Sequence, residues 1–492
     1  MSNYNLTLQS NNTDLQAILN TINELPEAGS SSSGSNNPNI STNEVNFYDY
    51  DGTLLHSYTV EEIQSMNELP ELPTREGLLC QGWNYDLNTI KSHNRELNIG
   101  AMYITSDGKT RIYIHLEEGR TSPMLGVCPN GTVAVDWGDG TAPDTLTGND
   151  VYTVKYTPNH EYSEPGDYVI KLTVNGTMGF MGDNGSYILR YNNSSTDKRY
   201  RVYLNAVQKI EIGNGVISIG DYAFSGCYSL SSITIPDGVT SIGKEAFDNC
   251  YSLSSINIPN SVTSIGSYTF LDCHSLSSIN IPNGVTRIGN GTFSICNSLS
   301  SVVIPDSVTS IGSNAFSNCN SLSSVVIPNS VTSIDKGAFS YCYSLSSINI
   351  PDSVTSIGDN TFSNCNSLSS ITIPDSVTSI DNYTFSECNS LSSITIPDGV
   401  TSIGDRAFSN CYSLSSITIP DDVTSIGSYT FFDCRSIRYY DFTTHTTIPT
   451  LSNTNAFNGI SDDCEIRVPA SLYDEWITAT NWSTYANYIK AI

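Results

Sequence analysis

Ten cysteines recur every 23 residues in this chain, and this period constrains the fold more than any other feature of the sequence. They are Cys227, Cys250, Cys273, Cys296, Cys319, Cys342, Cys365, Cys388, Cys411 and Cys434. A phenylalanine precedes each of them by three residues, from Phe224 to Phe431. Disulfide frameworks and zinc sites have uneven, paired cysteine spacings. A single cysteine per period therefore indicates one structural position that is repeated.

The apolar residues of one unit show how the period folds. They are Leu230, Ile233, Ile235, Val239, Ile242, Ala246, Phe247 and Cys250. The first three alternate and predict a short strand with its apolar side chains inward, which Pro236 ends because proline cannot continue a ladder. The remaining residues turn the chain back and fill the coil. A 20–29-residue unit of this pattern is typical of a leucine-rich repeat, whose units must stack because none closes a core alone.

The consensus I-P-[DN]-x-V-T-x-I-[GD]-x-x-[AT]-F-x-x-C is more specific than the general class. It resembles the BspA-like leucine-rich repeats of bacterial surface proteins, closely over 207–434 and loosely over 437–468. The resemblance implies a solenoid that serves adhesion and protein binding and has no catalytic residues. We expect one continuous solenoid over 207–470, whose parallel strands form one face.

The period breaks after Cys434, where the sequence predicts a cap. Ile466 and Val468 predict the last strand. A capping box at 471–474 predicts a short helix that ends at Trp476, within a cap over 471–492. Three aromatic side chains are expected to cover the open core: Trp482, Tyr485 and Tyr488.

Three regions precede the repeats. Apolar residues at helical spacing predict a helical segment in 1–28, and the Ser- and Gly-rich stretch predicts a flexible linker over 29–42. Residues 43–98 resemble the small β-grasp repeats of the internalin B type. This resemblance rests on Phe47, Asp49, Asp51, Gly52, Pro73, Gly77, Gly82 and Trp83.

Residues 99–206 alternate like strands, with a hairpin turn predicted at 106–109. The motifs W-G-D-G-T at 137–141 and H-x-Y-x-x-x-G-x-Y at 160–168 resemble a PKD domain, an immunoglobulin-like β-sandwich that serves as a spacer on extracellular proteins. The predicted fold class is therefore mainly β: a leucine-rich-repeat solenoid of 23-residue units preceded by a β-grasp-like domain and an Ig-like sandwich.

The charge balance excludes several partners. The chain has 21 basic and 49 acidic residues, a net charge of −28. Nucleic acids and anionic membrane surfaces both need clustered Lys and Arg, so neither is an expected partner. No apolar run is long enough for membrane insertion, and the first 30 residues lack the basic start and apolar core of a secretory signal.

Three sequence patterns imitate chemical sites. Asp49 and Asp51 stand as in the nucleophile motif of haloacid-dehalogenase-like phosphatases, but the surrounding region lacks βα alternation, which favours a β-turn. Residues 238–245 nearly form a phosphate-binding loop, with Glu where Mg²⁺ coordination needs Ser or Thr. Asp136 and Asp139 could contact Ca²⁺, although turn roles explain them better. We therefore expect no enzyme activity, no cofactor and no metal.

The repeated cysteines are expected to be small buried groups with free thiols. Bridging between stacked neighbours stays geometrically open, because the strand spacing overlaps the Cα distances of disulfides.

Comparison between repeats separates exposed positions from core positions. The outward strand position and the position after each cysteine vary, and Tyr and Asn recur there, as they do in binding surfaces. The candidate binding residues are Tyr228, Tyr251, His274, Tyr343, Tyr412, Asn257, Asn280, Val303, Val326 and Asn349.

Two functional hypotheses follow from the sequence. The first is a non-enzymatic adhesion protein, extracellular or at a cell surface, that recognises a protein or carbohydrate on a cell surface through its solenoid. The alternative is a tail or receptor-binding component of a phage virion, which contacts other virion proteins through its N-terminal segment. The absence of a visible signal peptide favours the alternative.

Overall fold

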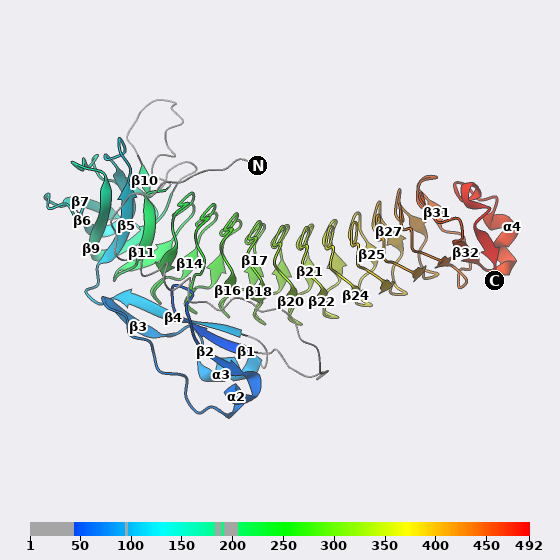
Figure 1. Ribbon diagram of the computed structural model, residues 1–492, viewed down its shortest axis with the longest axis horizontal. Helices are drawn as coiled ribbons and strands as arrows, with labels where there is room; N and C mark the ends of the chain where they lie inside the picture. Colours follow the sequence, from blue (N-terminus) through cyan, green and yellow to red (C-terminus); the bar gives the residue numbers. More distant parts are fainter. Residues whose placement is uncertain (1–43, 94–96, 183–187, 191–204) are drawn as a thin grey trace, which may run out of the picture. The chain divides into compact units, whose positions relative to one another are not determined.

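The computed structural model describes residues 44–93, 97–182, 188–190 and 205–492. The helix predicted in 1–28 and the linker predicted in 29–42 lie outside the described residues. The described chain is mainly β and consists of a first domain (44–105), a second domain (110–190) and a repeat solenoid (207–492) (Figure 1). Of the helices in these ranges, none has the length and apolarity needed to span a membrane.

The first domain is a mixed four-stranded sheet with two short helices. Its elements are β1 (Glu44–Tyr48), β2 (Leu54–Thr59), α2 (Val60–Ser65), β3 (Leu78–Trp83), α3 (Leu87–His93) and β4 (Leu97–Thr105). The strand order is β2-β1-β4-β3, in which β1 and β4 run parallel in the centre and the outer strands pair antiparallel. Phe47, Ile63 and Trp83 belong to its buried core. The internalin B-type resemblance stays a prediction.

β4 crosses the boundary predicted at 98/99, since its whole length pairs within the first sheet. The turn at 106–109 is also not a hairpin, because the following strand β5 (Thr110–Leu116) pairs with other strands. The turn packs against the first coil of the solenoid instead: the Thr105 N–H donates to the Ile212 carbonyl, and the Asn214 N–H to that of Gly108. A contact so distant in sequence leaves no local signal.

The second domain is built on two long strands and continues directly into the solenoid. After β5 come β6 (Met124–Asp136), β7 (Asp144–Asn149), β8 (Lys155–Tyr156), β9 (Gly166–Phe180) and β10 (Leu189–Arg190). β5 pairs antiparallel with β11 (Val207–Glu211), and β9 pairs parallel with β12 (Val216–Ile219). One buried apolar cluster runs through both parts. The second domain therefore closes the N-terminal end of the solenoid; its PKD-like identity stays a prediction.

The solenoid has about 12 turns, and each regular turn contributes two short strands. Three-residue strands form the surface that we call the strand face: β13 (Ser232–Thr234), β16 (Ser278–Asn280), β18 (Ser301–Val303), β20 (Ser324–Val326), β22 (Ser347–Asn349), β24 (Ser370–Thr372), β26 (Ser393–Thr395), β28 (Ser416–Thr418) and β30 (Tyr439–Asp441). Two-residue strands form a second ladder: β14 (Ser241–Ile242), β15 (Ser264–Ile265), β17 (Arg287–Ile288), β19 (Ser310–Ile311), β21 (Ser333–Ile334), β23 (Ser356–Ile357), β25 (Ser379–Ile380), β27 (Ser402–Ile403), β29 (Ser425–Ile426) and β31 (Thr450–Leu451).

All strand pairs between solenoid turns are parallel, as the repeat predicted. The expectation of one sheet face was too simple, because the V-T-S-I segment of each unit forms the second ladder. Each turn also presents a third side, the turn between its two-residue strand and the next three-residue strand. In one repeat this segment is 313–321, and we call its side chains that are not buried, such as those of Asn314, Asn318 and Asn320, the turn edge.

The repeated phenylalanines form a continuous ring ladder inside the solenoid. Successive rings lie 5.1–5.9 Å apart, centroid to centroid, from Phe180 of β9 to Phe457 beyond the last regular repeat. All of these rings are buried. The inward positions predicted from the unit, including Leu230, Ile233 and Cys250, are buried as well.

The C-terminal cap confirms the predicted aromatic cover but not its local details. Trp482 and Tyr485 are buried against Phe457, at ring distances of 5.5 and 5.2 Å. The final strand is not β32 (Glu465–Val468) but β33 (Ile489–Ala491), which pairs parallel with it.

The predicted capping box at 471–474 is wrong. Ser471 lies inside the 3₁₀ helix η2 (Ala470–Leu472), because the chain already turns after Pro469. Leu472 therefore precedes α4 (Tyr473–Trp476), without a side-chain cap. A second 3₁₀ helix, η3 (Trp482–Tyr485), carries the covering aromatics.

Candidate functional site

The outward positions of the strand face divide into a covered part and an open part. Asn257 donates from Nδ2 to a backbone carbonyl of β4 (2.9 Å), Asn280 is 7% exposed, and Val303 packs against the core of the first domain. Val326 is 51% exposed, and Asn349 is exposed too. The two neighbouring valines therefore do not form one exposed patch, because the first domain covers part of the strand face.

The first domain is held on the strand face by polar contacts and by one close approach. Tyr85 donates from its hydroxyl to the Ile281 carbonyl (2.9 Å), and Ser255 donates to a carbonyl in the turn between β1 and β2 (3.3 Å). A β-carbon at Gly100 would lie 2.1 Å from Asn257 Oδ1, so this contact needs glycine. The segment 255–257 carries two of these contacts and is not a regular strand.

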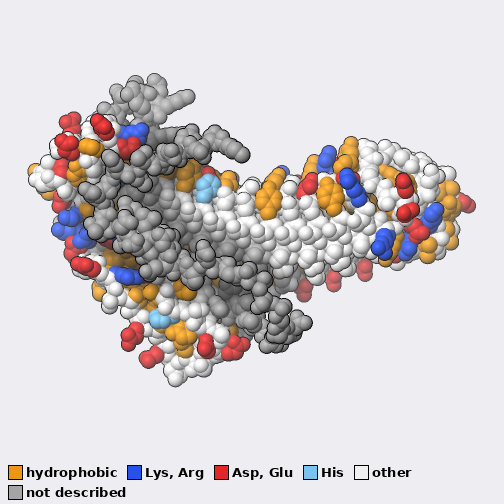
Figure 2. All heavy atoms as spheres, in the orientation of Figure 1, with side chains coloured by type: hydrophobic (Ala, Val, Ile, Leu, Met, Phe, Trp, Pro, Cys, Tyr) orange, Lys and Arg blue, Asp and Glu red, His pale blue; other side chains and the backbone are white. Residues whose placement is uncertain are grey.

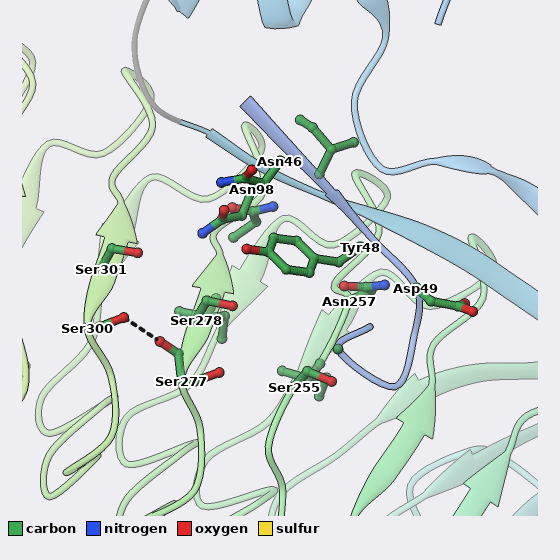
Figure 3. A pocket seen from close by; sticks show the side chains of 15 residues that line it. Asn46, Tyr48, Asp49, Asn98, Ser255, Asn257, Ser277, Ser278, Ser300 and Ser301 are labelled. Atoms are coloured by element: carbon green, nitrogen blue, oxygen red, sulfur yellow. Dashed lines mark hydrogen bonds between the residues drawn. The ribbon is translucent and has the colours of Figure 1, made fainter. Parts of the chain in front are cut away.

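A cavity of about 220 Å³ lies where the first domain meets the strand face. One wall carries Asn46 and Tyr48 of β1 and Asn98 of β4. The other carries serines and asparagines of three successive solenoid turns, among them Ser278 and Asn280. Figure 3 shows these polar side chains facing one another across the cavity.

Three of the predicted residues on the turn edge come together in one stack. The rings of Tyr228 and Tyr251 lie 4.7 Å apart and nearly parallel, and Tyr251 stacks on His274 at 5.0 Å. The ladder continues with Asn297 Nδ2, which lies 3.1 Å from His274 Nδ1, and with Asn320, which donates from Nδ2 to Asn297 Oδ1 (3.2 Å). The rings of Tyr228, Tyr251 and His274 cover part of one another, so these side chains are half-buried. Only the remaining part of each ring is accessible to a ligand.

Other tyrosines of the turn edge are more exposed. Tyr343 and Tyr412, both predicted, are 41% and 39% exposed. Tyr341 and Tyr383, at 41% and 38%, were missed by the sequence reasoning. They lie two residues after and two residues before a repeated phenylalanine. Comparison between repeats would have found Tyr383, because tyrosine recurs two residues before the phenylalanine, at Tyr222, Tyr268 and Tyr429. Tyr341 is the only tyrosine at its repeat position, so no recurrence pointed to it.

Arginines lie over several of these rings. The Arg406 guanidinium lies 4.7 Å from the ring centroid of Tyr429 and 5.9 Å from that of Tyr383, and Arg435 lies 5.8 Å from that of Tyr412. Figure 2 shows hydrophobic side chains with basic ones between them along one long side of the solenoid. Tyrosine and arginine are the residues that most often carry binding energy in protein interfaces.

The repeated thiols have a specific structural partner. From Cys250 to Cys434, each Sγ donates to the carbonyl of the phenylalanine 26 residues earlier, at 3.0–3.3 Å. Burial raises the pKa of Cys342 and Cys388 to about 12. The thiol is therefore neutral near pH 7, and it links neighbouring turns as a weak donor.

The aspartates of the phosphatase-like motif have structural roles. Asp49 is fully buried, forms an ion pair with Arg75 and accepts the N–H of Tyr50 (2.8 Å). Asp51 accepts the N–H of Thr53 (3.0 Å) and shapes the turn. The turn roles predicted for both residues are confirmed.

The other two patterns are also accounted for by local contacts. Lys244 forms an ion pair with its neighbour Glu245 (3.0 Å), and its loop lies in the repeat without a following helix. Asp139 contacts His160 Nε2 (2.7 Å), and Asp136 accepts the N–H of Gly138 (3.0 Å). Within the described ranges, no group of three His, Cys, Asp or Glu side chains is arranged to hold a metal ion.

Solved structures of several bacterial repeat proteins are similar to this chain. A leucine rich cell surface protein from Faecalibacterium prausnitzii A2-165 is 30% identical over 59% of this chain and 96% of its own, with a TM-score of 0.34. A leucine-rich repeat protein from Bacteroides ovatus ATCC 8483 is 28% identical over 58% and 84%, with a TM-score of 0.40. The pneumococcal vaccine antigen PcpA is 18% identical over 65% and 85%, with a TM-score of 0.45. No curated protein matches the chain.

The family model of the BspA type leucine rich repeat region matches residues 198–323 and 309–438. These residues contain the regular turns, the ladder phenylalanines from Phe224 to Phe431 and the hydrogen-bonded cysteine thiols from Cys250 to Cys434. The repeat region of this chain therefore belongs to the BspA-type leucine-rich repeats.

Proposed function

We propose that this protein is a non-enzymatic binding protein, displayed outside the cell, that recognises a protein or glycan on a cell surface through the turn edge of its solenoid. The observation that carries the proposal is the set of four tyrosines that are 38–41% exposed along this edge. Each projects from a rigid coil, so contact costs little conformational entropy. The membership of the repeat region in the BspA type supports binding and external display.

The arrangement of the edge favours a macromolecular ligand. The exposed rings are distributed over turns from Tyr341 to Tyr412, and Arg406 and Arg435 lie among them. A small molecule cannot contact such a long row at once. The neighbouring strand face offers mainly Ser, Thr and Asn, so the edge is the part of the solenoid richest in hot-spot residue types.

The experiment uses the whole chain on arrays of immobilised host extracellular proteins and of glycans. Tyr341, Tyr343, Tyr383 and Tyr412 are then replaced together by serine, with retained folding checked by circular dichroism and thermal melting. We expect a loss of at least tenfold in affinity for the partner that wild-type protein binds. The matched control is Tyr152→Ser, which removes a 72% exposed tyrosine of the second domain.

Unchanged binding by the folded quadruple variant would contradict the proposal. If deletion of residues 1–105 removed that binding instead, recognition would belong to the N-terminal part of the chain.

A further inference from the structure

The cavity between the first domain and the strand face has the polarity of a binding site for a neutral polar ligand. Its wall contains asparagine amides and serine hydroxyls, which both donate and accept hydrogen bonds. Among the described residues that line it there is no Lys, Arg or His, and their single carboxylate, Asp49, is buried in its ion pair with Arg75. The described wall therefore offers an anion no cationic partner and a cation no free carboxylate.

The size of the cavity limits what can enter it. A volume of about 220 Å³ corresponds to about seven water molecules at ~30 Å³ each. This is room for one sugar ring rather than for a peptide or a nucleotide. The Tyr48 ring extends from β1 over the cavity between Asn98 and Asn257 (Figure 3) and offers an apolar surface to the C–H face of such a ring.

An independent observation points to a missing hydrogen-bond donor. The side-chain oxygen Oδ1 of Asn280 is buried, and no described residue donates to it. Buried amide oxygens are nearly always paired, since leaving one unpaired is costly. Asn280 lies at the outward position of β16 and lines the cavity, so a ligand hydroxyl there would supply the absent donor.

We propose that this cavity binds one neutral monosaccharide unit, with Asn280 Oδ1 accepting a hydrogen bond from a sugar hydroxyl. The amides of Asn46 and Asn98 contact hydroxyls on the opposite wall, and the Tyr48 ring covers one face of the sugar. The site is separate from the turn edge and does not depend on the function proposed for that edge. Because its walls come from two parts of the chain, sugar binding also strengthens the contact between the first domain and the solenoid.

The test is saturation-transfer NMR on the full chain with a panel of free sugars: glucose, galactose, mannose, fucose, N-acetylglucosamine and N-acetylgalactosamine. We expect saturation transfer to at least one of them. Asn280→Leu should lower the affinity for that sugar at least tenfold. Thr372→Leu is the matched control, because Thr372 has the same repeat position in β24, outside the cavity, and should leave the affinity unchanged.

A second variant keeps the test decisive if Asn280→Leu disturbs the fold. Ser278→Leu fills the cavity from a partly exposed position and should abolish binding without removing the amide. Absence of saturation transfer to every sugar would overturn the proposal, and so would equal binding by wild type and a folded Ser278→Leu variant. Replacement of the four exposed tyrosines should not change sugar binding, which separates this site from the turn edge.

Discussion

Two residues in each regular turn of the solenoid, which we also call a coil, adopt a left-handed backbone. The first lies two residues before the repeated phenylalanine, and the second lies two residues after it. The second of these is Asn in four coils, at Asn249, Asn318, Asn364 and Asn410, with φ near +60°. Asparagine tolerates this conformation better than other non-glycine residues. Tyr341 and Tyr383, two of the exposed tyrosines of the turn edge, occupy these two positions.

Ile295 occupies the second of these left-handed positions in its coil, and it is the one β-branched residue there. It has φ +62° although isoleucine is β-branched, so its coil is strained. Ile295→Asn should stabilise the protein by about 1 kcal/mol, the cost of a left-handed conformation. The reverse change Asn318→Ile should destabilise it by a similar amount. Urea unfolding of the two variants measures this, and destabilisation by Ile295→Asn would show that apolar contact of the side chain outweighs strain.

Phe316 shows what one residue of the ring ladder contributes. Its ring is buried between those of Phe293 and Phe339, each 5.4 Å away. Phe316→Ala should cost about 3–5 kcal/mol through lost burial and the remaining cavity. Each coil contacts only its neighbours, so amide hydrogen exchange should rise near this coil and stay unchanged in the second domain. A uniform rise along the chain would contradict the nearest-neighbour description.

The repeated thiols stabilise the contact between elements, since each Sγ donates a hydrogen bond to a backbone carbonyl of the coil before it. Thiols ordinarily have a pKa near 8.5, and burial raises the pKa of Cys342 and Cys388 to about 12. The folded state therefore binds these protons more tightly than the unfolded state. The resulting stability is fully present below about pH 8.5 and is lost as pH rises toward 12.

This linkage predicts a selective alkaline weakness of the solenoid. Between pH 8 and 10 each buried thiol should lose roughly 1–2 kcal/mol of its contribution, at 1.36 kcal/mol per pKa unit. Replacing Cys342 and Cys388 by alanine should make the free energy of unfolding fall less steeply with pH. Urea titrations under reducing conditions at both pH values measure the difference. Identical slopes would mean that these thiols already ionise freely in the folded protein.

At the scale of the whole molecule, the solenoid depends on closed ends. β5 and β9 pair with β11 and β12, and β33 pairs with β32 at the opposite end. An uncovered end would offer unpaired strand edges and open apolar core, which promote aggregation.

Two truncations test this dependence. A chain that starts at residue 107 keeps the second domain and should remain monomeric and folded. A chain that starts at residue 207 loses that cover and should aggregate, as size-exclusion chromatography would show. A monomeric, cooperatively melting protein from residue 207 would mean that the first coil closes itself.

The parts predicted correctly from the sequence are those that the chain repeats. Leu230, Phe247 and Cys250 have counterparts in every regular unit, so their burial could be inferred without an alignment. The contact of Gly100 with Asn257 occurs once and joins segments that are distant in sequence, so no local sequence pattern could predict it. The same holds for β33, whose Ile489 lies in no repeat motif. Of the candidate binding residues, the exposure of Tyr343 could be anticipated, but the covering of Val303 could not.

The ring ladder and the parallel ladders have a consequence for how the length of this protein can change. Each regular coil has the same 23-residue register and forms its inter-turn hydrogen bonds with the coils next to it, so gain or loss of a whole coil preserves these contact types. The first domain occupies the turns around Asn257, Asn280 and Val303, and a coil duplicated between residues 320 and 400 would not disturb it. In-frame recombination between the near-identical repeats would therefore produce longer or shorter foldable variants. The length of the solenoid is thus free to vary among descendants while the closed ends and the docked domain stay constant.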